Sequence, residues 1–164
     1  MAAGNTYEAI ATQTLGSTAS SVTFSSIPST YTDLVLVINS TGSGTSYMKV
    51  RCNGNTNNSY YSTTILEGDG SAASSLRYSN SVYSGMIGTV TSTIGNQIVQ
   101  FMNYSNTTTY KTFLSRDNSS IRTRANVNLF QSTSAISSFE ITVPDAPNFS
   151  SGSTFTLYGI KNSA

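Results

Sequence analysis

The 164-residue sequence contains no histidine, no tryptophan and a single cysteine, and only 9% of its residues are charged. Histidine is the side chain most often used in general acid–base catalysis, and a catalytic cysteine needs a neighbouring base or cation to activate it. The seven carboxylates are scattered along the chain without a recognisable catalytic spacing. These absences favour a non-enzymatic protein and predict no catalytic residue, no cofactor and no metal.

Other shortages narrow the choice of partners and compartment. Cys52 has no second cysteine to pair with, which excludes an intramolecular disulfide and predicts a buried strand residue. No apolar run is long enough for a membrane span, and Met1–Ala11 lacks the basic and apolar regions of a secretory signal. The net charge of +1 gives no strong field toward nucleic acid or anionic lipid. We therefore expect synthesis in a reducing cytoplasm and neither nucleic-acid nor membrane partners.

About four residues in ten are Ser, Thr or Asn, and short β-rich runs are separated by Gly, Asn, Asp and Ser. No stretch has the capped, 3.6-residue periodicity of a helix. The pattern predicts an all-β protein, with residues 1–164 forming a single-domain antiparallel β-sandwich, jelly-roll-like, of about eight or nine strands. Residues 71–97 are rich in Ser and Gly and predict a long, partly irregular connection.

Two features suggest contacts between subunits. The run Leu34-Val35-Leu36-Val37-Ile38 is apolar at every position, so Leu34, Leu36 and Ile38 are predicted in a central strand or at a subunit contact. Arg122 and Arg124 share one face of an extended segment, where they would either grip a carboxylate of a neighbouring chain or remain solvated. The weak contribution of exposed ion pairs favours solvation.

The sequence Glu67-Gly68-Asp69-Gly70 holds the closest pair of carboxylates. Calcium binding by Glu67 and Asp69 is one interpretation, but Ca²⁺ normally takes six or more oxygen ligands, and a glycine-rich turn is the favoured one. A glycosidase would need an organised pair of carboxylates, and no two of the seven stand out. An enzymatic, polysaccharide-degrading function is accordingly disfavoured.

The ten tyrosines suggest a recognition surface. Tyr60, Tyr61, Tyr78 and Tyr83 lie in segments rich in Asn and Ser, where they would stack on sugars or pack against protein. The alternative is that they are half-buried strand residues, since tyrosine is also common in strands. The sequence does not decide between the two.

Five phrases carry a resemblance that spans most of the chain. They are Tyr7–Gly16 (YEAIATQTLG), Phe24–Val37 (FSSIPSTYTDLVLV), Arg51–Gly54 (RCNG), Asn103–Arg116 (NYSNTTTYKTFLSR) and Ser151–Lys161 (SGSTFTLYGIK). With them the chain resembles small virion structural proteins of tailed bacteriophages, of the kind found in phages of aquatic bacteria and cyanobacteria. The most specific phrases are IPSTYTDLVLV and FTLYGI.

This resemblance implies a structural component on the outer surface of the virion, without catalytic residues. We expect a capsid decoration or cement protein that binds capsid or tail subunits and forms a homo-oligomer, with a trimer favoured. The alternative is a tail-fibre or receptor-binding domain that recognises host-surface glycan through the four tyrosines.

Overall fold

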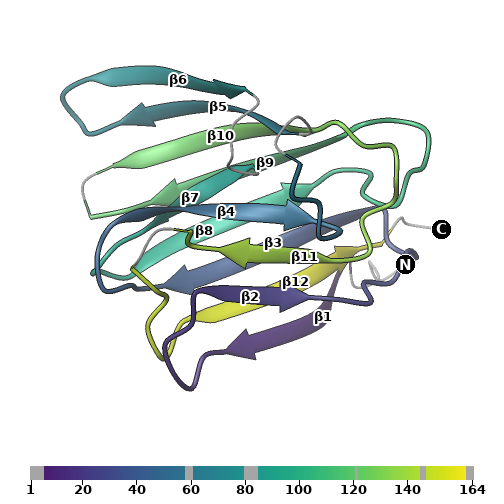
Figure 1. The fold of residues 1–164 in the computed structure, drawn as a ribbon, viewed down its shortest axis with the longest axis horizontal. Coiled ribbons are helices and arrows are strands. Elements are labelled where there is room, and N and C mark those ends of the chain that lie inside the picture. The colour runs from purple at the N-terminus through teal and green to yellow at the C-terminus, as the bar shows by residue number, and fades with distance from the viewer. Residues whose placement is uncertain (1–5, 58–60, 80–84, 121, 145–146, 162–164) are drawn as a thin grey trace, which may run out of the picture.

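The structure is a computed structural model that describes residues 6–57, 61–79, 85–120, 122–144 and 147–161. These residues form twelve β-strands and no helix, so none of them is in a helix able to span a membrane (Figure 1). The strands are β1 (Tyr7–Thr14), β2 (Ser21–Phe24), β3 (Asp33–Ser40), β4 (Ser46–Cys52), β5 (Tyr61–Gly68), β6 (Ala73–Ser79), β7 (Met86–Val90), β8 (Gly95–Phe101), β9 (Lys111–Asn118), β10 (Thr123–Phe130), β11 (Phe139–Thr142) and β12 (Thr154–Ile160).

The strands form two antiparallel sheets that pack face to face as a β-sandwich, which confirms the predicted fold class. The large sheet has the order β1-β12-β3-β8-β9-β10-β5-β6, and the small sheet has the order β2-β11-β4-β7. Apolar side chains from the two inner faces fill the core between them. The ring of Phe101 in the large sheet stacks on that of Phe139 in the small sheet, with centroids 4.9 Å apart.

Strand β3 shows how the sequence pattern places side chains. Leu34, Leu36 and Ile38 alternate along the strand and have no exposed surface, because they point into the core between the sheets. They pack inside one chain and are therefore not subunit contacts. The central position of β3, between β12 and β8, agrees with the prediction for this run.

Consecutive strands repeatedly fall in opposite sheets. Without the hairpins β5–β6 and β9–β10, the two sheets would have the orders β1-β12-β3-β8 and β2-β11-β4-β7. The large sheet is therefore extended at one edge by two hairpins, and the jelly-roll-like topology stays a prediction. In Figure 1 the hairpin β5–β6 lies at that edge, beyond the small sheet.

Residues 71–97 differ from the prediction. Instead of a largely irregular connection, this segment contains β6, β7 and the start of β8, which brings the number of strands above the eight or nine expected. Ser and Gly have weak intrinsic preference for strands, so the sequence signal is faint. Strand β6 forms by pairing with β5 in a hairpin, and β7 forms by pairing with β4, which lies more than thirty residues away in sequence.

Candidate functional site

The added hairpins have an unusual distribution of polar and apolar side chains. On β9 and β10 the buried inner face carries polar residues, including Ser115, Asp117, Arg124 and Asn126. The outer face of the same strands carries exposed Leu114 and Val127. This part of the large sheet therefore buries polar side chains beside apolar ones and exposes apolar side chains on its outer face, which departs from the usual arrangement.

The inner face is polar because it contacts strand β7 through hydrogen bonds. Asn128 donates from Nδ2 to the carbonyl of Met86 at 3.0 Å, and its Oδ1 accepts a bond of 2.7 Å from the hydroxyl of Thr63. The backbone N–H of Met86 in turn donates to the Thr63 hydroxyl at 3.3 Å. These bonds attach β7 to both β10 and β5.

Arg124 is the centre of this inner polar cluster. Its Nε lies 2.7 Å from Oε2 of Glu67, its Nη1 donates to the hydroxyl of Thr89, and its guanidinium lies over the ring of Tyr47, 5.5 Å from the centroid. The hydrogen bond from Arg124 holds the pKa of Glu67 below its usual value. Only 8% of Arg124 is exposed, so this pair is shielded from solvent much better than a surface pair.

Asp117 lies beside this pair but is poorly satisfied. Its Oδ2 is 3.6 Å from Nη1 of Arg124, and neither carboxylate oxygen has a hydrogen bond of good geometry, although Arg124, Asn126 and the backbone of Thr89 lie near enough to favour the charged form weakly. The backbone of β7 covers it so closely that a Cβ on Gly88 would lie 3.1 Å from the Cβ of Asp117. This burial raises the pKa of Asp117 to about 6.

The structure settles the geometry of the predicted arginine pair. Arg122 and Arg124 do share a face, and both bind Glu67 of the same chain, with Arg122 Nη1 3.1 Å from Oε1. They therefore do not reach out to a carboxylate of a neighbouring chain, and Arg124 is not solvated. Glu67 could not be identified as their partner from the sequence, because the pairing of β5 with β10 brings it to them.

The predicted carboxylate loop forms a turn. Oδ1 of Asp69 accepts hydrogen bonds from the N–H groups of Ser71 and Ala72, at 2.9 and 3.0 Å, and these bonds lower the pKa of Asp69 to about 2. The oxygens of Glu67 are bound by arginines. In the part of the chain that the structure describes, no group of three or more acidic, cysteine or histidine side chains could hold a metal.

The four predicted recognition tyrosines do not share one exposed surface. Tyr61 is 3% exposed, its ring stacks on Phe130 at 5.0 Å, and its hydroxyl accepts a 2.9 Å hydrogen bond from the N–H of Cys52. It is a core residue, which excludes it from a paratope. Tyr78 is half-buried on β6, and Tyr60 and Tyr83 lie outside the described residues.

The most distinctive surface is on the opposite side of the hairpins. We define the outer-face patch by five side chains that lie on adjacent strands of the large sheet and point away from the small sheet. They are Ile98 of β8 (36% exposed), Leu114 of β9 (40%), Ala125 and Val127 (47%) of β10, and Leu66 of β5 (55%).

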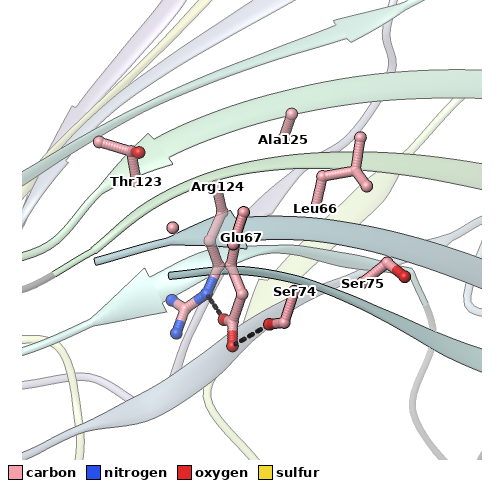
Figure 2. Close-up of a pocket in the computed structure, with 9 residues that line it drawn as sticks. Leu66, Glu67, Ser74, Ser75, Thr123, Arg124 and Ala125 are labelled. Atoms are coloured by element: carbon pink, nitrogen blue, oxygen red, sulfur yellow. Dashed lines mark hydrogen bonds and ion pairs between the residues drawn. The ribbon is translucent and has the colours of Figure 1, made fainter. Parts of the chain in front are cut away.

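The strand register makes these residues neighbours. Leu114 pairs with Val127, and Ala125 pairs with Leu66. The patch is hollowed, with one shallow depression of about 650 Å³ around Leu66 and Ala125 and another of about 400 Å³ around Ile98, Leu114 and Val127. Figure 2 shows Leu66 and Ala125 on one side of the sheet and the pair Glu67–Arg124 on the other.

Two exposed arginines belong to this face. Arg116 of β9 pairs across with both Ile98 and Ala125, and Arg77 of β6 pairs with Thr64 of β5. Within the described residues, neither arginine forms an ion pair. This surface was not predicted from the sequence, although the adjacent apolar residues Phe113 and Leu114 indicate that β9 has apolar side chains on both faces.

Comparisons with known proteins do not assign the chain. No family model and no curated protein matches it. Among solved structures, a mutant of the alginate lyase Aly36B in complex with alginate tetrasaccharide is similar over 82% of this chain and 72% of that chain, with 10% identity and a TM-score of 0.30. A likeness this weak carries no argument about function.

Proposed function

We propose that this protein is a non-enzymatic component of a bacteriophage virion, a decoration or cement protein that binds capsid subunits on the outer surface of the head. The resemblance in sequence suggests the virion, and the observation that carries a docking role is the outer-face patch. An apolar, hollowed face on an otherwise polar protein is typical of a surface that another protein covers.

The arrangement of ionisable groups supports a binding function over catalysis. The buried charged residues of the inner polar cluster are bound to each other or enclosed by β7, and Arg124 is held by Glu67 and Thr89. Such a cluster fixes the hairpins against the small sheet. It thereby holds the outer face of the same strands in one shape.

The mechanism would be thermodynamic linkage. A protein that binds only the assembled capsid stabilises that state by mass action. The free energy of stabilisation grows with the logarithm of the ratio of the protein's concentration to its Kd for the capsid. Interfaces of this kind bury about 800 Å² on each partner, so neighbouring residues of the large sheet would contribute with the patch.

The glycan-binding alternative receives less support. Sugar recognition relies on stacking against aromatic rings, whereas the side chains that line the two depressions are aliphatic or polar. The burial of Tyr61 also removes one of the four tyrosines on which that interpretation was based. The trimer remains a prediction, and light scattering of the purified protein tests it.

A capsid-binding assay tests the proposal. Particles made without this protein, by disruption of its gene, should lose integrity at a lower temperature than complete particles. Purified protein should bind to these particles and raise that temperature to the value of complete particles. The variant Leu66→Ser/Val127→Ser should bind at least tenfold more weakly. The variant Ile94→Ser is the control, because Ile94 is 70% exposed but lies outside the patch.

Two results would contradict the proposal. One is that particles without the protein are as stable as complete ones and do not bind it. The other is that binding is equally strong in the patch variant and the control, which would move the docking surface elsewhere on the molecule.

A further inference from the structure

We infer that the partner of the outer-face patch is an acidic protein surface, one that presents carboxylates to Arg77 and Arg116 on either side of an apolar centre. This inference rests on the proposed docking function and adds the chemistry of the partner. It follows from the distribution of charge over the described residues.

The two arginines stand out because the other charged side chains are already engaged. Among the described carboxylates, Glu8 pairs with Lys161 at 2.5 Å, Glu140 pairs with Arg51 at 3.0 Å, and Glu67 binds two arginines. Asp69 is held by its own turn, and Asp117 is buried.

One further described carboxylate, that of Asp33, accepts a 2.7 Å hydrogen bond from the N–H of Asn103. No carboxylate therefore lies on the outer face beside Arg77 or Arg116 in the part of the chain that the structure describes. An exposed guanidinium in a mostly apolar surface is a common feature of protein interfaces, where arginine is enriched.

The strand geometry gives the spacing that the partner needs. Arg116 is on β9 and Arg77 is on β6, three strand positions apart in the order β9-β10-β5-β6. With neighbouring strands about 4.8 Å apart and a register offset of two residues, the two arginines are separated by about 15 Å. Between them lie Leu66, Ala125 and Val127 of the patch.

A second copy of this chain fits this surface poorly. Among the described residues, a second copy could supply a carboxylate only by giving up one of the contacts described above, and a copy that faced the patch with its own patch would add two more arginines to the interface. Like charges at an interface oppose binding. The aliphatic centre also fits apolar protein side chains better than a sugar ring or a nucleic-acid base.

The test uses the purified full chain and particles made without it. We expect Arg77→Gln/Arg116→Gln to bind the particles about tenfold more weakly, a loss of about 1.4 kcal/mol, which is the size expected for two partly exposed ion pairs. The control Ser17→Glu/Thr23→Glu changes the net charge by the same amount outside the patch and should bind normally. Binding of the unmodified chain should weaken with rising salt.

A complementary measurement changes the partner instead. Converting the carboxylates on the particles to neutral amides, with carbodiimide and ethanolamine, should weaken binding of the unmodified chain and leave binding of Arg77→Gln/Arg116→Gln nearly unchanged. Mock-treated particles provide the comparison.

The outcomes separate the two proposals. If the unmodified chain does not bind the particles at all, the proposed function fails. If it binds them, but neither the arginine substitutions nor amidation weakens binding, the function stands and the acidic partner is refuted. If Arg77→Gln/Arg116→Gln instead dissociates an oligomer of this chain in sedimentation experiments, the occupant is a second copy and the inference is overturned.

Discussion

Replacing Asp117 with asparagine should stabilise this protein at neutral and alkaline pH. Asp117 is 5% exposed and neither carboxylate oxygen has a hydrogen bond of good geometry, so burial outweighs the weak stabilisation of its charge by Arg124, Asn126 and the backbone of Thr89. Oδ1 of Asn126 is also buried without a partner. An asparagine at position 117 removes the charge and provides an amide N–H group within the same cluster.

The magnitude follows from the pKa. Burial raises the pKa of Asp117 from 3.8 to about 6. Between these two values the folded protein holds a proton that the unfolded chain has released, so the free energy of unfolding falls as the pH rises. Each unit of pKa difference is worth about 1.36 kcal/mol, which gives a loss of about 3 kcal/mol by pH 7.

Urea unfolding at several pH values measures this effect. We expect Asp117→Asn to match the unmodified protein near pH 4 and to exceed it by up to about 3 kcal/mol at pH 8, a shift in midpoint of about 1–2 M urea. Asp69→Asn is the control, because Asp69 is exposed and well bonded, and it should gain nothing at pH 8. A variant less stable than the unmodified protein at pH 8 would refute the reasoning, since attraction to Arg124 would then outweigh burial.

Two further substitutions test the inner cluster and the core. Arg124→Gln leaves Glu67 and Asp117 without their buried cation and should lower the free energy of unfolding by about 3–5 kcal/mol. The side chain of Arg122 is 40% exposed, so Arg122→Gln should lower the free energy of unfolding by less than about 1 kcal/mol. Equal losses in urea unfolding would contradict the central role of Arg124. Tyr61→Phe removes the hydroxyl that accepts the hydrogen bond from Cys52 and should cost about 1–3 kcal/mol by the same measurement; no loss would mean that water replaces the bond.

Strands with regular alternation carry a clear sequence signal. The runs that form β8, β9 and β12 alternate buried and outward side chains, and β8 pairs with β9 in a register that places Phe101 opposite Phe113. Strands β6 and β7 were not predicted, because ASSLRYS and MIGTV have no clear alternation and form only in the presence of their neighbours.

The candidate site was less predictable than the fold. The shared face of Arg122 and Arg124 follows from their spacing alone. Their contact with Glu67 depends on the pairing of β10 with β5. More than fifty residues separate these two strands in the sequence, so no local motif encodes the contact. The outer-face patch has the same origin, because its five side chains come from four strands.

The inner cluster and the outer patch constrain each other. Successive side chains of a strand point to opposite faces, so a one-residue slip of β10 would turn Val127 inward and expose Arg124. The buried pair of Arg124 with Glu67 and the hydrogen bonds of Asn128 to β7 oppose such a slip. The apolar side chains of Leu66, Leu114 and Val127 are therefore held outward by the polar contacts beneath them. The proposed docking function requires a surface of this kind, because a partner can bind tightly only to apolar side chains that are held in one arrangement.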